Sequence, residues 1–189
     1  MLLHEKVSVP DFVRGSALLE GAFGVASEAH LGPRRRTETD LDHPVEVARL
    51  LHEAGFGEEI VAAALLHDVI EDTTVELSEL AERFSPAVAE LVAAMTENEG
   101  IEPFEERKAE HRERVAAHGW HAASIYAADK LAKTRKLRGD GSSVSEEKLI
   151  HYRLTLERLR ADHSELPFLA ELEEELAALI ERPAPTSGA

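Results

Sequence analysis

The sequence predicts an all-α fold, and three observations support that prediction. Apolar residues recur at helical spacing along nearly the whole chain, no run of β-branched residues alternates as in a strand, and proline and glycine stand where helices would begin and end. At 189 residues the chain has the size of one ordinary domain that buries its own core. We therefore expect a single helical bundle.

Proline and glycine set the boundaries of the first expected helices. The first helix should start after Pro10 and run to about His30, followed by the loop LGPRRRTETDLD, which is basic at first and acidic later. The second should start at Pro44, which suits the first turn of a helix, and stop at Gly55.

Further helices are expected along the rest of the chain. They are EEIVAAALLHDVI, residues 77–84, 85–95, 103–118 and 121–139, and two amphipathic helices within 144–181. The turn GDGSS precedes the last two, and the tail 183–189 is expected to be disordered. We see no internal repeat or linker, so residues 1–182 are expected to form one domain.

The composition narrows the classes of function. The 37 acidic residues outnumber the 21 basic ones, for a formal net charge of −16. Such a surface repels nucleic acid and anionic membrane, although it allows one anionic ligand held by a local basic patch or a metal. The chain has no cysteine, so disulfides and thiolate metal sites are excluded. No apolar run has the length of a signal peptide or membrane span, so we expect a soluble cytoplasmic protein.

One stretch, AALLHDVIEDTT at residues 63–74, places polar side chains in a segment that otherwise looks buried. On a helix the imidazole and the three carboxylates of this stretch fall within an arc of about 140°; they belong to His67, Asp68, Glu71 and Asp72. A carboxylate in apolar surroundings must be paired or must bind a cation, because unpaired burial costs too much free energy. The alternative is a helix end that has reached water, with its acids solvated.

Two other residues favour a metal site. His43 stands at the start of a helix in DHP, and Asp129 interrupts the apolar run SIYAADKLA. Together with His67 and Asp68 they give two imidazoles and two carboxylates without sulfur. This ligand set suits a divalent ion such as manganese, iron or zinc and leaves positions open for water and substrate. Spacing alone does not show that the four side chains converge.

The pattern of a lone His, an HD dipeptide and a lone Asp resembles the HD-domain metal-dependent phosphohydrolases. More narrowly, AALLHDVIEDT is similar to the signature of RelA/SpoT-type hydrolases of the alarmone guanosine tetraphosphate (ppGpp), in which Glu-Asp-Thr follows the HD. The similarity extends over residues 26–137 and includes HPVEVARLL, LAERFSPAVAELVAAMT, PFEERK and ADKLAKTRKL. Without a synthetase domain, the chain resembles the small stand-alone hydrolases of this group.

The resemblance implies an HD-domain helical bundle and a division of roles in its site. The four ligand candidates named above would hold one divalent ion, expected to be Mn²⁺, with Zn²⁺, Fe²⁺ or Mg²⁺ as alternatives. Glu71 and Asp72 would position or deprotonate the water that the ion activates. The implied reaction is hydrolysis of the 3′-pyrophosphate of ppGpp or its pentaphosphate, which gives GDP or GTP and pyrophosphate in the stringent response.

A basic pair is the first expected substrate contact. In the family this pair follows a His that corresponds to His30, and Arg35 and Arg36 match it best. In so acidic a protein, consecutive arginines suit a clamp for phosphate or base, and the alternative is a solvated loop cluster. The histidines other than His43 and His67, including His30, are expected to be surface or structural.

Two features depart from the family pattern. Lys133 stands where the family usually has Asn, four residues after Asp129, so it can share a helix face with that carboxylate and is a candidate substrate contact. The loop TETDLD is shorter than usual, and Asp40 occupies the place of a Tyr. The other basic residues expected to be solvated on this helix are Lys130, Lys136 and Arg138.

Three functions stay open at this point. The first is hydrolysis of the alarmone. The second keeps the enzyme class but changes the small-molecule substrate to a nucleoside phosphate or the 2′-phosphate of NADPH, which the altered loop and Lys133 favour. The third is a non-catalytic nucleotide sensor, which would not need Glu71 and Asp72. The sequence does not indicate an oligomeric state.

Overall fold

A computed structural model describes residues 8–31, 41–141 and 143–181, and within these ranges it contains helices and no strand. The all-α prediction is therefore confirmed. The chain divides into two compact units, residues 1–93 and 94–189. None of the described helices is long and apolar enough to cross a membrane. The tail 183–189 lies outside the described residues.

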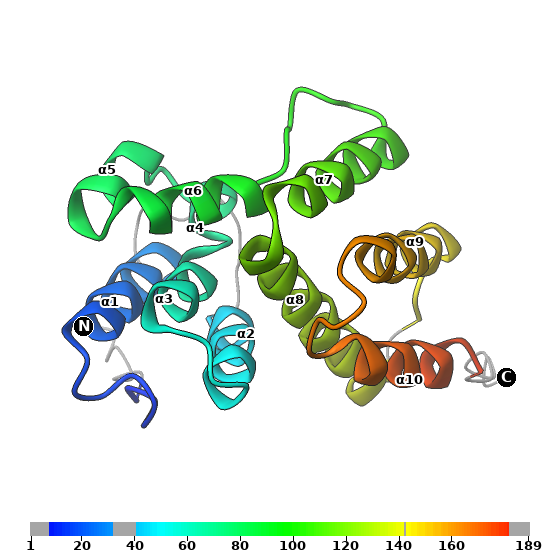
Figure 1. The fold of residues 1–189 in the computed structure, drawn as a ribbon, viewed down its shortest axis with the longest axis horizontal. Coiled ribbons are helices and arrows are strands. Elements are labelled where there is room, and N and C mark those ends of the chain that lie inside the picture. The colour runs from blue at the N-terminus through cyan, green and yellow to red at the C-terminus, as the bar shows by residue number, and fades with distance from the viewer. Residues whose placement is uncertain (1–7, 32–40, 142, 182–189) are drawn as a thin grey trace, which may run out of the picture. The chain divides into compact units, whose positions relative to one another are not determined.

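Helix α3 is the centre of the first unit. The helices of this part are α1 (Ala17–Leu31), α2 (Asp42–Glu53), α3 (Glu58–Leu66), α4 (Val69–Asp72) and α5 (Leu77–Arg83), followed by α6 (Pro86–Met95). Figure 1 shows α3 between α1 and α2, and it packs against both. Residues 61–66 are all buried, because two neighbouring helices cover an element that is apolar on every side.

The start of the first helix differs from the prediction. Helix α1 begins at Ala17 and not after Pro10, because residues 11–15 form turns. Gly15 ends these turns with a φ of +87°, a backbone conformation that glycine adopts without the strain a side chain would cause.

The helix expected to continue through HDVI is interrupted. Helix α3 ends at Leu66 and α4 begins at Val69, so His67 and Asp68 lie in a turn between two helices. In a continuous helix the carbonyl of Ala64 would accept the backbone N–H of residue 68. Here the ring Nδ1–H of His67 donates to that carbonyl over 2.8 Å. The side chain thus takes the place of a backbone partner, and we call this turn the HD break.

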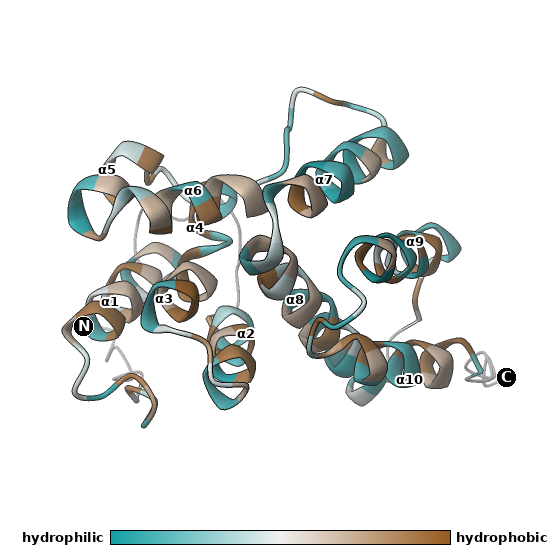
Figure 2. Cartoon of the chain, in the orientation of Figure 1, coloured by the Kyte–Doolittle hydropathy of each residue, from teal (hydrophilic) through white to brown (hydrophobic). Residues whose placement is uncertain are grey.

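Helix α8 is the centre of the second unit. Its helices are α7 (Phe104–His118), α8 (Trp120–Gly139), α9 (Glu146–Asp162) and α10 (Leu169–Ile180). Helix α8 packs against α7, α9 and α10, and its residues 122–132 are all buried. Helix α7 is mostly hydrophilic and α3 mostly apolar (Figure 2), which agrees with a peripheral place for α7 and a central one for α3 within their units.

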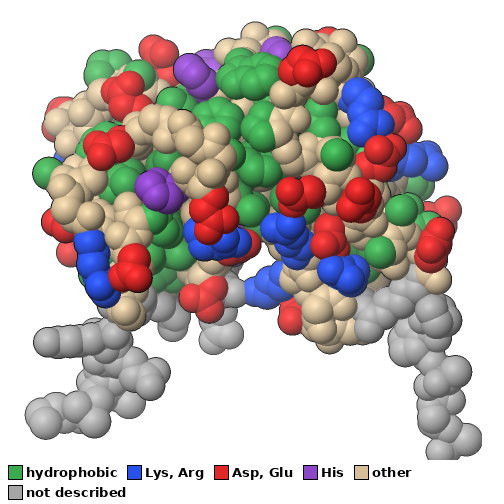
Figure 3. Space-filling model, turned by 60° about the horizontal axis from the view of Figure 1, so that its bottom comes forward, with side chains coloured by type: hydrophobic (Ala, Val, Ile, Leu, Met, Phe, Trp, Pro, Cys, Tyr) green, Lys and Arg blue, Asp and Glu red, His purple; other side chains and the backbone are tan. Residues whose placement is uncertain are grey.

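The surface reflects the excess of acidic residues. Acidic side chains are spread over the face drawn in Figure 3, with basic ones between them. Many of the basic groups are paired within their own helix or with a neighbouring one, as in the contact of Arg49 with Glu46 and that of Arg160 with Glu173. Such exposed pairs contribute little to stability individually.

Candidate metal centre

His67 is held with one ring nitrogen directed toward a backbone carbonyl. Its side chain is 2% exposed, and its Nδ1–H donates to the carbonyl of Ala64. This hydrogen bond places the ring proton on Nδ1 and leaves the lone pair on Nε2. A carbonyl partner of this kind is what orients a metal-binding imidazole. The HD break therefore presents a nitrogen with the properties of a metal ligand.

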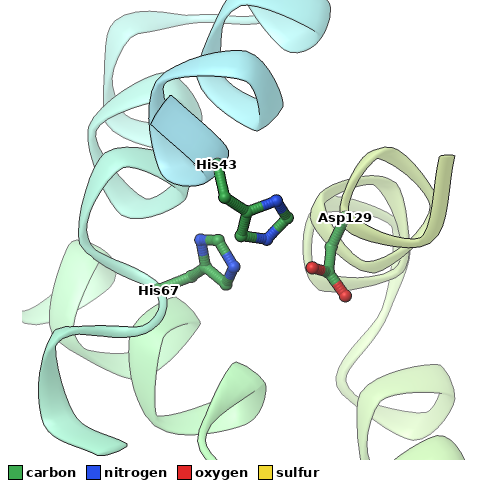
Figure 4. A group of neighbouring side chains, drawn as sticks. All are labelled: His43, His67 and Asp129. Atoms are coloured by element: carbon green, nitrogen blue, oxygen red, sulfur yellow. The ribbon is translucent and has the colours of Figure 1, made fainter. Parts of the chain in front are cut away.

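Asp68 lies against the imidazoles of His43 and His67. Its Oδ1 is 3.1 Å from His67 Nε2, and its Oδ2 is 3.7 Å from His43 Nε2. His43, in the first turn of α2, is side by side with His67, with 5.3 Å between the ring centroids (Figure 4). The lone pair of His67 Nε2 and the nearby carboxylate oxygen are both electron donors. A cation bound between them would therefore be stabilised by both. The three residues fit a divalent ion that accepts nitrogen and oxygen ligands.

Asp129 is the corresponding carboxylate of the second unit. It lies on α8 (Figure 4), and its side chain is buried among the apolar residues of that helix. Its Oδ2 is 2.7 Å from the Nζ of Lys130, and its Oδ1 is 2.8 Å from the Nζ of Lys133. The prediction that Lys133 shares a helix face with Asp129 is confirmed. Two lysines thus neutralise this buried carboxylate.

Lys130 contradicts the expectation that it is solvated. It is 5% exposed, and its Nζ lies 4.4 Å from the ring centroid of Tyr126 and 5.7 Å from that of Tyr152. Burial by itself lowers the pKa of Lys130, but Asp129, together with Tyr126 and Tyr152, outweighs it, so the pKa is raised above its ordinary value. An ion pair and two aromatic faces replace the water that the ammonium group loses. Lys136 and Arg138 are exposed, as expected.

Two more lysines belong to this part of the second unit. Burial lowers the pKa of Lys108 on α7, and although Glu97 opposes this, the charges of Lys130 and Lys133 lower it further. The pKa of Lys148 on α9 is lowered by burial and then by Lys133, Lys130 and Lys108. We call these four residues the lysine cluster. Neither Lys108 nor Lys148 was among the candidates chosen from the sequence. Lys108 could have been noticed, because it lies in PFEERK, one of the motifs that resemble the family.

Glu71 and Asp72 lie on the short helix α4, which follows the HD break and packs against α1. Both side chains are half-buried, and Asp72 Oδ2 is 3.9 Å from the Nδ1 of His30. Burial lowers the pKa of His30, although the charges of Asp68 and Asp72 oppose that shift. Sequence reasoning expected His30 to be surface or structural. A surface place is wrong, because His30 is buried beside a proposed catalytic carboxylate. The match of His30 to a family histidine was the signal in the sequence that pointed to the site.

The predicted basic pair lies outside the described residues. Arg35, Arg36 and the departing position Asp40 all fall within 32–40. Their substrate contacts therefore stay a prediction.

The chain belongs to the HD domain family. The family model described as HD domain matches residues 22–148. Among relatives of this class, the chain is 33% identical over 127 residues to the guanosine-3′,5′-bis(diphosphate) 3′-pyrophosphohydrolase MESH1 of Danio rerio, which covers 65% of this chain and 70% of that protein. It is 38% identical over 125 residues to the protein of the same name from Mus musculus, which covers 64% and 69%.

A bacterial relative matches only in part. The guanosine-3′,5′-bis(diphosphate) 3′-pyrophosphohydrolase of Aquifex aeolicus is 37% identical over 100 residues, which are 52% of this chain and 14% of that protein. The chain thus spans a small part of the length of this relative.

Two solved structures share the fold. One, described as a metazoan ortholog of SpoT that hydrolyzes ppGpp and plays a role in starvation responses, has a TM-score of 0.72 at 26% identity and covers 92% of this chain and 98% of its own. The other, from Listeria monocytogenes, has a TM-score of 0.66 at 32% identity and covers 74% and 99%.

Proposed function

We propose that the protein hydrolyses the 3′-pyrophosphate of guanosine tetra- or pentaphosphate, giving GDP or GTP and pyrophosphate. The observation that carries the proposal is the HD break, in which His67 Nε2 and a carboxylate oxygen of Asp68 lie 3.1 Å apart. The two MESH1 proteins, which bear the name of this activity, match over more than two thirds of their own length, and this supports the choice of substrate. We also propose that the protein is cytoplasmic, because that localisation suits a nucleotide substrate.

One divalent ion, proposed to be Mn²⁺, is the cofactor. The proposed ligands are His43, His67, Asp68 and Asp129, because of their residue types and their match to the family pattern. When bound, the ion lowers the pKa of water and offsets negative charge on the phosphate under attack. The Ala64 carbonyl keeps the His67 ring in the tautomer that this role requires.

Glu71 and Asp72 are proposed to handle the proton. As water attacks the 3′-phosphorus and the bond from phosphorus to the ribose oxygen breaks, a carboxylate accepts the proton of the water and the ribose oxygen takes up a proton. His30, which is buried beside Asp72, would orient that carboxylate while it stays neutral itself.

The lysine cluster supports an anionic, multiply phosphorylated substrate. Burial lowers the pKa values of Lys108 and Lys148, and the repulsion between the ammonium groups of the cluster lowers them further. A phosphate placed among them would relieve that repulsion, and a protein with a net charge of −16 needs such a local concentration of positive charge to attract a nucleotide. We propose that Lys133 of this cluster, together with Arg35 and Arg36, contacts the substrate.

A second candidate is the same hydrolysis chemistry on another nucleotide, such as NADPH at its 2′-phosphate. Lys133, in place of the Asn that is usual in the family, favours this candidate, because its ammonium group brings a positive charge to a phosphate and a neutral amide does not. A non-catalytic sensor is the third candidate and predicts binding without turnover.

A nucleotide panel distinguishes these candidates. The protein is incubated with ppGpp, its pentaphosphate, NADPH or GTP in the presence of Mn²⁺, and released phosphate and pyrophosphate are measured separately. The proposal expects pyrophosphate from the two alarmones, with no release in the presence of chelator. Hydrolysis of NADPH but not of ppGpp would contradict the assignment of the alarmone as substrate. It would still agree with a phosphohydrolase. Binding of a nucleotide without hydrolysis of any nucleotide in the panel would contradict both hydrolase candidates.

A further inference from the structure

We propose that Lys130 is a positioning residue that fixes Asp129 so that it offers one particular oxygen to the metal, and that Lys133 competes with the metal for that oxygen. The inference rests on the proposed function, in which Asp129 is a metal ligand. It assigns opposite roles to two lysines that carry the same charge and contact the same carboxylate.

Lys130 is held in place from several sides. Its Nζ is 2.7 Å from Asp129 Oδ2, and the rings of Tyr126 and Tyr152 lie around the ammonium group at 4.4 and 5.7 Å. Both rings are themselves buried. With 5% of its surface exposed, Lys130 has little access to water as a replacement partner. The bond between Lys130 and Oδ2 is therefore a fixed part of the core of the second unit.

Lys133 contacts Asp129 through its ammonium group but is far more exposed than Lys130. Its Nζ is 2.8 Å from Asp129 Oδ1, but its side chain is 37% exposed. A lysine stem is flexible and its ammonium group is well hydrated in water, so this contact can be exchanged for solvent at little cost. Oδ1 is thus the exchangeable oxygen of Asp129 and Oδ2 is the fixed one. On release from Oδ1, Lys133 is available for a phosphate of the substrate.

The two lysines should therefore affect metal binding in opposite directions. Loss of the Lys133 ammonium group removes a competitor for Oδ1 and should strengthen binding of the ion. Loss of the Lys130 ammonium group releases Oδ2 and lets the carboxylate rotate, which should weaken binding. If both lysines acted only as positive charges that repel the ion, removal of either one would strengthen binding.

Calorimetric titration of the full chain with Mn²⁺ tests the inference without reference to activity. Lys133→Met should bind Mn²⁺ several-fold more tightly than the wild type. Lys130→Met should bind it more weakly by about tenfold or more, as is common when a group that orients a ligand is removed. Lys130→Arg keeps the charge and the contact with the aromatic rings, and it should restore most of the affinity.

A pair of substitutions at Tyr126 covers the case in which Lys130→Met does not fold. Tyr126→Phe keeps the ring on which the ammonium group rests and should bind Mn²⁺ like the wild type, whereas Tyr126→Leu removes the ring and should bind it more weakly. Equal affinities for these two variants, or tighter binding by Lys130→Met, would overturn the positioning role while the proposed metal site stands. A wild type that binds no Mn²⁺ would overturn both proposals.

Discussion

His111 on α7 allows a quantitative prediction about stability in acid. The residue is 3% exposed, and burial lowers its pKa to about 3, helped by the charge of Lys130 and opposed by that of Glu97. In the unfolded chain a histidine has a pKa of about 6.5. The folded protein therefore favours the neutral ring. This titration therefore leaves the free energy of unfolding unchanged above about pH 6.5 and lowers it progressively as the pH falls from 6.5 toward 3.

The magnitude follows from these two pKa values. At pH 7 both states hold His111 mostly neutral, so the ring contributes almost nothing to a difference between them. At pH 5 the unfolded state has taken up its proton while the folded state has not, and the difference amounts to about 2 kcal/mol of unfolding free energy. A loss of this size is a large part of the stability of an ordinary domain.

The assay compares urea unfolding at pH 7 and pH 5 for the wild type and for His111→Gln, which removes the titrating ring. Between these pH values the wild type should lose about 2 kcal/mol more unfolding free energy than the variant. His121→Gln, at an exposed position next to the start of α8, is the matched control and should keep the pH dependence of the wild type. If the wild type and His111→Gln lose the same unfolding free energy between pH 7 and pH 5, burial of His111 does not cause the acid sensitivity.

Three further predictions concern the proposed site. Asp68→Ala should lose both the bound Mn²⁺ and activity, as measured by elemental analysis and turnover, and an unchanged metal content would remove Asp68 from the ligand set. Glu71→Gln with Asp72→Asn should keep the metal while turnover falls by orders of magnitude, and loss of the metal would make them ligands instead. Arg35→Ala should raise KM by about 10- to 100-fold with a smaller effect on kcat, as expected if one charge-assisted phosphate contact is lost, and a change in kcat alone would contradict that role.

The central helices of both units could be predicted from the sequence. Helix α3 is apolar over residues 60–66 after Gly57, and the first half of α8 is mostly apolar after Gly119, so the apolar pattern and the start of each helix agreed with the structure. The ligand candidates could be chosen because carboxylates are rare in such segments and need a partner there.

Other features depend on contacts that pattern does not contain. The HD break arises because the His67 ring competes for the Ala64 carbonyl, which a helical periodicity cannot indicate. Lys130 looked solvated because a single lysine next to an acid usually is, and its burial depends on the rings of Tyr126 and Tyr152. The division into two compact units was not foreseen, because the sequence shows no linker at the boundary after residue 93. That residues 1–182 form one domain stays a prediction.

Identification of the products formed from ppGpp tests the proposed activity most directly. The protein is incubated with ppGpp and Mn²⁺, and the phosphorus-containing products are resolved by ³¹P NMR. We expect GDP and pyrophosphate in equal amounts, and no conversion with chelator or with Asp68→Ala. Release of inorganic phosphate in place of pyrophosphate, or cleavage that continues without a divalent ion, would contradict the account.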